Sequence, residues 1–227
     1  MKGMANKCVV LVDNSNVFIE GQKHSARLKG IKPDPVTGKQ ACDPSWRVNF
    51  AALLSALAGT RKIYKALLVG SRPPQNDGVW EAAKHQGFDV VVHDRSADNR
   101  EKAVDTELVA QGTEIICIAS ESMDLVIVSG DRDFIPLVKV AHRRGWNVEM
   151  AAFSSAYNPA GEMAMSVEKI VPLDGLFCSG KSGNTALIGR SRRAMMAQLG
   201  RASFGVRRLR HDFELFPFAI FERVIFL

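Results

Sequence analysis

The sequence has few cysteines and histidines, and neither type forms a metal-binding or redox pattern. No Cys-x-x-Cys pair occurs, the five His are isolated from one another, and the four cysteines are scattered (Cys8, Cys42, Cys117 and Cys178). This spacing argues against a zinc site and against a disulfide framework. We interpret the cysteines as reduced thiols and expect a cytoplasmic protein.

Long apolar runs, internal repeats and the Gly-x-Gly-x-x-Gly dinucleotide fingerprint are also missing. No run reaches the length that crosses a bilayer, so we expect no membrane partner. Hydrophobic residues make up 46% of the chain and charged residues 24%, which is typical of a soluble globular protein. A length of 227 residues predicts one domain with an appendage.

The net charge of +6 is concentrated at the C-terminal end. Residues 178–227 hold nine Lys/Arg and three Asp/Glu, whereas residues 1–177 hold 21 of each. Six of the twelve Phe fall within 204–227. We therefore predict a folded domain over 1–177 and a basic, Phe-rich tail over 178–227. The tail is either an RNA- or partner-binding arm, a disordered appendage, or sequence that is not native to the gene.

One stretch matches the phosphate-binding pattern Gly-x4-Gly-Lys-Ser, between Gly175 and Ser182. It is followed by Gly183-Asn184, a poor helix start, and only 45 residues follow Ser182. The rest of a nucleotide-hydrolase sheet does not fit in that length, so we interpret the match as chance.

Apolar β-branched runs alternate with helical patterns along residues 8–173. Strands are expected near 8–13, 63–70, 88–93, 125–128, 146–153 and 167–173, and helices near 15–29, 48–58, 79–86, 101–118, 134–141 and 154–165. This alternation predicts an α/β fold, a three-layer sandwich around a parallel sheet.

Two of the expected strands end at acids. The run Cys8–Val12 ends in Asp13, and an acid there is costly unless it is paired or binds a cation. Asn14, Ser15 and Asn16 can each cap the following helix, so Asp13 is not needed as a cap. An aspartyl phosphotransferase would need Asp-x-Asp, which Asp13-Asn14-Ser15 does not provide.

The second acidic strand end follows Leu125–Val128 and reads Ser129-Gly130-Asp131-Arg132-Asp133. Asp131 and Asp133 also suit a helix N-terminus, which is the alternative interpretation. Asp105, in the first turn of the helix expected from 101, can reach the same edge, or it can simply complement the helix dipole.

Carboxylates gathered at one sheet edge without soft ligands favour Mg²⁺ or Mn²⁺. Such ions support in-line displacement at a phosphodiester. We predict that one carboxylate, Asp13, bridges two metals. Cationic side chains at the same edge are candidates to hold a phosphate backbone, although solvated surface charge is the alternative for each (Arg72, His93, Arg95, Arg100, Lys102 and Arg132).

Three motifs occur in an order that resembles NYN domains, and more narrowly the LabA-like group of PIN-like ribonucleases. They are Val-Asp-Asn-Ser-Asn at 12–16, Lys-x-x-Asp at 102–105 and Ser-Gly-Asp-x-Asp-Phe at 129–134. The resemblance covers roughly 7–173. It implies a Rossmann-like sheet of order 3-2-1-4-5, in which the strands carrying Asp13 and Asp131 are neighbours.

The resemblance also implies roles for individual residues. Asp13, Asp105 and Asp131 would bind Mg²⁺ or Mn²⁺, with Asp133 as a fourth catalytic acid. The substrate-binding candidates are Asn14, Asn16, Lys102, Arg132, Ser129, Arg72 and Arg95. The expected function is a metal-dependent endoribonuclease that hydrolyses RNA. The alternatives are a non-catalytic RNA-binding module and a DNA-directed nuclease. The family also allows a homodimer.

Overall fold

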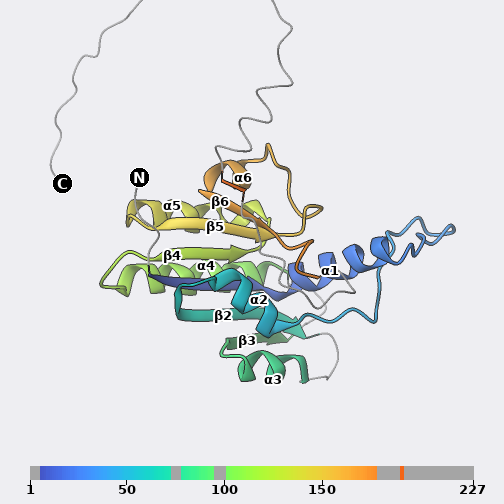
Figure 1. Cartoon of the computed structure of the whole chain (residues 1–227), viewed down its shortest axis with the longest axis horizontal. Helices are drawn as coiled ribbons and strands as arrows, with labels where there is room; N and C mark the ends of the chain where they lie inside the picture. Colours follow the sequence, from blue (N-terminus) through green and yellow to red (C-terminus); the bar gives the residue numbers. More distant parts are fainter. Residues whose placement is uncertain (1–5, 73–77, 95–100, 178–189, 192–227) are drawn as a thin grey trace, which may run out of the picture.

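The computed structural model describes residues 6–72, 78–94, 101–177 and 190–191 (Figure 1). Helices and strands alternate along most of the chain. In order they are β1 (Lys7–Asp13), α1 (Asn14–Leu28), α2 (Phe50–Ala58), β2 (Lys62–Arg72), α3 (Gly78–His85), β3 (Asp89–Asp94), α4 (Glu101–Ile118), β4 (Asp124–Val128), the 3₁₀ turn η1 (Arg132–Phe134), α5 (Ile135–Arg143), β5 (Asn147–Ala152), α6 (Glu162–Ser166), β6 (Lys169–Pro172) and β7 (Arg190–Ser191).

The strands form one sheet of order β3-β2-β1-β4-β5-β6-β7, in which the first six are parallel and β7 pairs antiparallel with β6. This confirms the α/β fold class and the predicted order 3-2-1-4-5, and adds β6 to the parallel part. Strands β1 and β4 lie side by side with Val12 opposite Val128. The chain reverses its winding direction between these two strands, so their carboxyl ends flank the crevice where open α/β sheets bind ligands.

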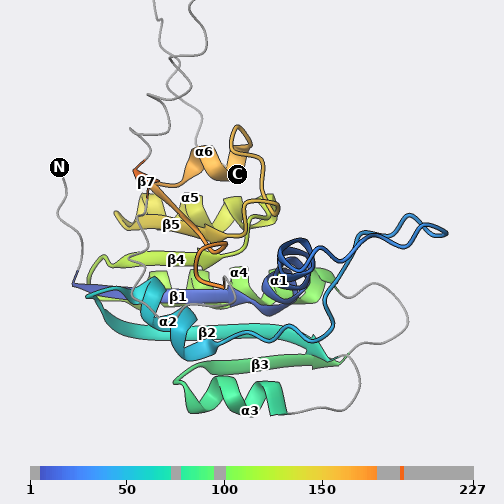
Figure 2. The same cartoon turned by 45° about the vertical axis from the view of Figure 1, so that its right-hand side comes forward.

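Helices cover both faces of the sheet (Figure 2). In β1, Val9 and Leu11 face a core formed with α4 and α5, while Cys8, Val10 and Val12 face a core formed with α1, α2 and α3. All five side chains are at most 1% exposed. A strand buried on both faces reads as a continuous apolar run, which is why the pattern is visible in the sequence.

Two expected elements differ from the structure. Residues 154–161 form turns, and the expected helix over 154–165 is reduced to α6. Asn158 and Pro159 explain the difference. The Asn158 side chain accepts from the Ala160 N–H, and the Asn158 carbonyl accepts from the Gly161 N–H, which forms a turn. Pro159 has no N–H to donate to a helix. Ser71 and Arg72, expected in a turn, extend β2.

A buried ion network fastens the opposite, amino-terminal edge of the sheet. Arg61 precedes β2 and is 8% exposed. Its guanidinium donates to Asp124 at 2.8 Å and to Glu149 at 3.0 and 3.1 Å, and also to the carbonyls of Leu57 and Ala58. Strands β4 and β5 are therefore tied to the α2–β2 connection far from the acidic edge.

The described part of the domain closes with an aromatic contact. Phe177 packs on Trp46, with ring centroids 5.4 Å apart, and on Phe153 at 5.8 Å. The predicted tail lies outside the described residues except for β7, and most of the Gly-x4-Gly-Lys-Ser match lies outside them as well. No helix within the described residues is long and apolar enough to span a bilayer.

Candidate functional site

The site begins where β1 and β4 end side by side. Asp13 is the last residue of β1, and Ser129 follows the last residue of β4. The Ser129 hydroxyl lies 3.5 Å from Oδ2 of Asp13 and accepts from the Asp131 N–H at 3.3 Å. Ser129 is 1% exposed, so this link between the two strand ends is shielded from water.

Asp13 is buried and caps helix α1. Its Oδ1 accepts from the Asn16 N–H at 3.1 Å. The expectation that neighbouring residues would cap this helix is therefore wrong, because the extended backbone at Asp13 places its own carboxylate over the first turn. Burial raises the pKa of Asp13 to about 6, and the Asp131 charge adds to the rise while the N–H groups of Asn16 and Ser15 oppose it.

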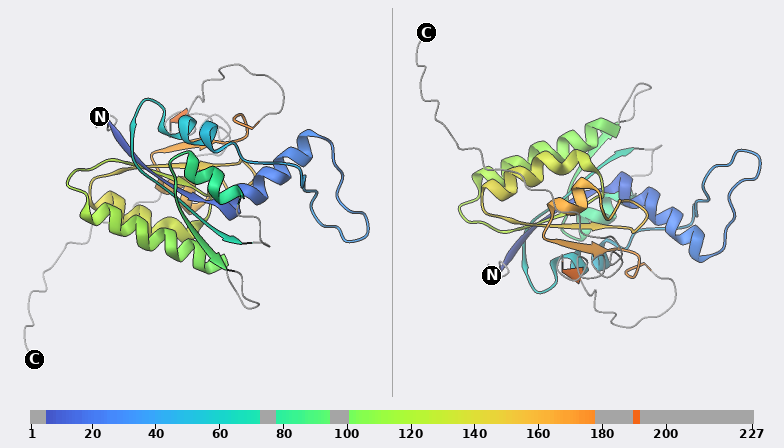
Figure 3. Two further views of the ribbon diagram at one scale, coloured as in Figure 1. Left: turned by 90° about the horizontal axis from the view of Figure 1, so that it is seen from below. Right: turned by 90° about the horizontal axis from the view of Figure 1, so that it is seen from above.

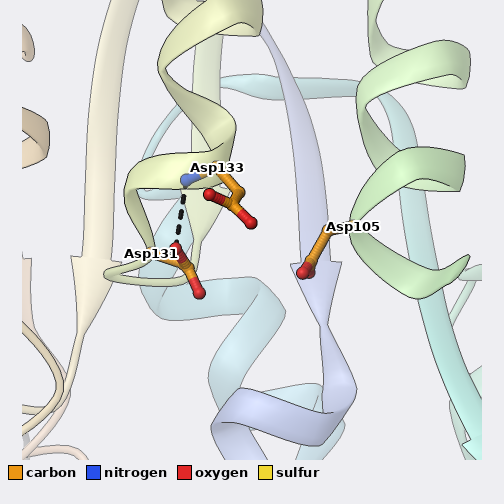
Figure 4. A group of neighbouring side chains, drawn as sticks. All are labelled: Asp105, Asp131 and Asp133. Atoms are coloured by element: carbon orange, nitrogen blue, oxygen red, sulfur yellow. Dashed lines mark hydrogen bonds between the residues drawn. The ribbon is translucent and has the colours of Figure 1, made fainter. Parts of the chain in front are cut away.

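Three further carboxylates converge above the strand ends. One oxygen from each of Asp105, Asp131 and Asp133 lies within 4.8 Å of the others (Figure 4). Asp105 comes from the first turns of α4, and the other two come from the turn after β4. Asp131 caps η1, because its carboxylate accepts from the Asp133 N–H at 3.0 Å. Asp131 therefore both caps a helical turn and belongs to the group of converging acids. Asp13 stands outside this trio.

Close packing holds the turn that carries two of these acids. A Cβ on Gly130 would lie 2.5 Å from the Ala156 carbonyl oxygen and 2.9 Å from Cβ of Tyr157. The loop 154–161 therefore lies directly against the backbone between Ser129 and Asp131. Gly130 has no room for a Cβ atom, so this position requires glycine.

Two pockets meet at the acids. The smaller, of about 170 Å³, is lined by Asp13, Asp105 and Asp131, together with four residues from α1 and one from α4 (Ser15, Asn16, Ile19, Glu20 and Val104). The larger, of about 590 Å³, is lined by Asp105, Thr106, Val109, Arg132, Asp133, Ile135, Pro136 and Glu162. Because Asp105 belongs to both linings, the pockets are adjacent across the trio.

The predicted substrate-binding residues divide into those whose side chains the structure describes and those whose side chains it does not. Asn16 lines the smaller pocket, Arg132 is exposed along the larger one, and Asn14 is buried at the start of α1. Ser129 lies beneath the acids. The structure describes the backbone but not the side chain of Arg72 and Lys102, which lie in β2 and α4, and Arg95 and Arg100 fall outside the described residues.

Some lining residues were not anticipated from the sequence. Ile19 and Glu20 lie three and four residues after Asn16 and so share its face of α1. That spacing could have identified them once Asp13 was placed at the helix start. Glu162 comes from α6, more than two dozen residues after the acidic turn, and no local pattern indicates it. His93 is half-buried, with Nε2 3.9 Å from Glu107.

The donor chemistry fits a hard divalent cation. Among the described residues that line the two pockets, none is His or Cys, and the acids supply carboxylate oxygens. Oxygen ligands suit Mg²⁺, Mn²⁺ and Ca²⁺ rather than zinc or copper. Three carboxylates this close repel one another unless a cation or protons compensate their charge.

The general class of this protein is a Rossmann-like α/β domain with an acidic site at the switch point of its sheet. The chain belongs to the NYN domain family, whose model matches residues 7–174. The match is to the family as a whole, and the LabA-like subgroup stays a prediction. No curated protein matches the sequence.

The fold is also similar to a crystal structure of a protein of unknown function from Vibrio parahaemolyticus. The two share 15% sequence identity with a TM-score of 0.56, over 78% of this chain and 98% of the other. This similarity supports the fold.

Proposed function

We propose that this protein is a metal-dependent endoribonuclease. The observation that carries the proposal is the convergence of Asp105, Asp131 and Asp133 at the carboxyl edge of a NYN-domain sheet, beside the buried Asp13. These acids come from three segments that are distant in sequence. Convergence of that kind costs electrostatic energy, which a bound cation would offset.

Asp105, Asp131 and Asp133 would hold Mg²⁺ or Mn²⁺, and Asp13 would complete the site from below. A bound ion of this type supplies an activated water and neutralises charge on the phosphodiester. Asp13 keeps Oδ1 on the Asn16 N–H, which fixes the direction of its other oxygen toward Ser129 and the pocket. The bridging of two metals by Asp13 stays a prediction.

Cationic residues around the acids would position the RNA backbone. Arg132 is exposed at the larger pocket, next to both Asp131 and Asp133 in sequence. Lys102 lies one helical turn before Asp105 in α4. We propose both as phosphate-binding residues, with Arg72 and Arg95 as candidates on neighbouring loops. The cytoplasmic location also stays a proposal, supported by the free thiols of Cys8, Cys42 and Cys117.

A non-catalytic RNA-binding module is the second candidate. It is favoured by the helix caps formed by Asp13 and Asp131, because each cap gives its acid a structural reason to be present without catalysis. The two candidates differ in whether the acids are needed for bond cleavage.

The test uses the full chain with single-stranded RNA, structured RNA and DNA of the same sequence, in Mn²⁺, in Mg²⁺ and in excess chelator. We expect cleavage of RNA with either metal and none in chelator, and loss of cleavage in Asp105→Asn. The matched control is Glu121→Gln, an exposed acid paired with Lys7 at the opposite sheet edge. RNA retention without cleavage would favour the binding module, and cleavage of DNA alone would identify a deoxyribonuclease. Cleavage that survives Asp105→Asn would remove that residue from the site.

A further inference from the structure

We propose that residues 27–47, called here the basic arm, bind the RNA strand that flanks the cleavage site. This inference rests on the proposed function, because it assigns a second contact to the same substrate. The basic arm continues helix α1 and projects outward from the acidic edge of the sheet (Figure 3). It returns to the domain before α2.

Charge distinguishes the basic arm from the rest of the domain. It contains five basic residues, all exposed, and two acids (Arg27, Lys29, Lys32, Lys39 and Arg47; Asp34 and Asp43). Residues 1–177 as a whole carry no net charge. Within the described residues, Lys32 and Lys39 have no ion-pair partner. A local excess of exposed cations beside an acidic edge is complementary to a phosphate backbone that must reach that edge.

Both acids of the basic arm are committed to holding its shape. Asp43 is 3% exposed and accepts from Ser25 at 2.5 Å, Lys29 at 2.6 Å and Ser45 at 2.6 Å. The Lys29 ammonium, with these hydroxyls, holds the pKa of Asp43 well below its usual range. Asp34 forms the turn at the tip by accepting from the Val36 N–H and the Thr37 hydroxyl. Lys29 therefore compensates the Asp43 charge, whereas Asp34 keeps its charge at the tip, and the basic arm carries a net charge of +3.

The base of the basic arm is fixed to the domain. Gly21 presses against the Trp46 ring, where a Cβ would lie within 3 Å of three ring carbons. Trp46 also packs edge-on against Phe153, with ring centroids 6.3 Å apart. The Asp43 N–H donates to the Gln22 carbonyl at 3.1 Å. A preorganised arm loses less entropy on binding than a flexible loop would.

A polar face of α1 connects the acidic pocket to the basic arm. Asn16 and Glu20 line the smaller pocket, and Lys23 and Arg27 follow at helical spacing. Lys23 donates to Glu20 at 2.7 Å, and Ser155 donates to Glu20 at 2.8 Å while accepting from Arg27 at 3.0 Å. The Glu20 charge is thus compensated. The path from Asn16 to Arg27 rises about 16 Å along the helix.

The basic arm also exposes three apolar side chains: Leu28 is 52% exposed, Ile31 41% and Val36 90%. These are able to contact base faces, or to meet a second copy of the chain. We favour RNA because the cations surround these residues, and like-charged arms from two copies would repel one another. Dimerisation through the arm is an outcome of the test.

The test compares how tightly the wild type, an arm variant and a control variant bind a fluorescent single-stranded RNA. The RNA has about 20 nucleotides, which is longer than common single-strand sites. Chelator is present so that no cleavage occurs. The arm variant is Lys32→Ala/Lys39→Ala/Arg47→Ala in the full chain. The matched control is Lys62→Ala/Lys84→Ala/Arg143→Ala, which removes three exposed charges at the opposite sheet edge. Both proteins keep the same residues 178–227, so any binding there contributes equally.

Each phosphate contact contributes about 0.7 to the slope of log affinity against log salt for single strands. We therefore expect the arm variant to lose about 2 from that slope and between about tenfold and a hundredfold in affinity near 0.1 M salt. The control should bind like the wild type. The melting temperature of each variant shows whether it is folded.

Equal binding by the arm variant and the control would overturn the inference, even if the protein cleaves RNA. A shift from dimer to monomer with unchanged RNA affinity would also overturn it and would assign the basic arm to self-association. If RNA is never cleaved but binding depends on the arm, the inference stands and the nuclease proposal fails. The two proposals are therefore tested separately.

Discussion

The buried Asp13 predicts an unusual separation of stability from activity in the variant Asp13→Asn. Burial raises the pKa of Asp13 from 3.8 to about 6. Each pKa unit corresponds to about 1.4 kcal/mol, so ionised Asp13 costs the metal-free fold about 3 kcal/mol at neutral pH. Asn caps helices as well as Asp does, so the Asn16 hydrogen bond is retained.

The sign of the pH dependence follows from the raised pKa in the folded state. As pH rises from about 4 to about 6, the unfolded chain releases the Asp13 proton first, so stability falls over this window and then levels off. In chelator at pH 7.5, Asp13→Asn should be more stable than wild type by about 1–3 kcal/mol, or about 2–12 °C in melting temperature for a chain of this size. RNA cleavage should be abolished in the same protein.

The assay is thermal unfolding by circular dichroism at a series of pH values in chelator, with Asp13→Ala as the control. The Ala variant also removes the charge but loses the cap, which costs about 1 kcal/mol, so it should melt below Asp13→Asn. An Asp13→Asn protein that melts below wild type at pH 7.5 would refute the reasoning, because its carboxylate would then stabilise the metal-free fold.

Three further predictions follow from the packing. Gly130→Ala should cost about 1–3 kcal/mol and most of the activity, because its Cβ meets the Ala156 carbonyl, whereas Gly175→Ala, with nothing within 4 Å, should match wild type in melting and cleavage assays. Arg61→Ala should cost about 3 kcal/mol in urea unfolding, because among the described residues Asp124 stays buried with no ion-pair partner and Glu149 keeps only Lys169, at 3.2 Å. Loss of the exposed Lys84–Glu81 pair in Lys84→Ala should leave the urea midpoint close to that of the wild type, and comparable losses in the two variants would contradict the role of the Arg61 network. A chain ending at Phe177 loses the two-residue edge strand β7 but should keep close to the wild-type melting temperature, and a large drop would show that residues 178–227 contribute much of the stability of the domain.

The sheet could be predicted from the sequence because its central strands are buried on both faces. Cys8–Val12 and Leu125–Val128 are uninterrupted apolar runs, and the alternation of strands with helices leaves few parallel topologies. The expectation of a helix over 154–161 overlooked Asn158-Pro159 and Gly161, which are turn signals. The Asn158 side chain and carbonyl accept the N–H groups of Ala160 and Gly161 there. The Arg61 network joins residues 63 and 88 positions apart, and no local pattern reveals it.

The acids of the site were predictable as strand-end and first-turn residues, but their arrangement was not. Asp13 and Asp131 each satisfy a helix N-terminus, and the cap geometry decides where each carboxylate points. The 3₁₀ turn brings Asp133 beside Asp105 and Asp131, whereas Asp13 remains buried below them. The depth of a side chain depends on packing by α1 and the loop 154–161, which sequence patterns do not report.

The measurement that tests the central claim most directly is Mn²⁺ binding to the full chain, followed by electron paramagnetic resonance of the free ion. Wild type and Asp131→Asn would be compared with Glu121→Gln, an exposed acid at the far sheet edge. We predict that wild type and Glu121→Gln bind Mn²⁺ alike and that Asp131→Asn binds at least about tenfold more weakly, because it loses one of three converging carboxylates. Equal Mn²⁺ affinity in all three proteins would contradict a metal centre at this edge.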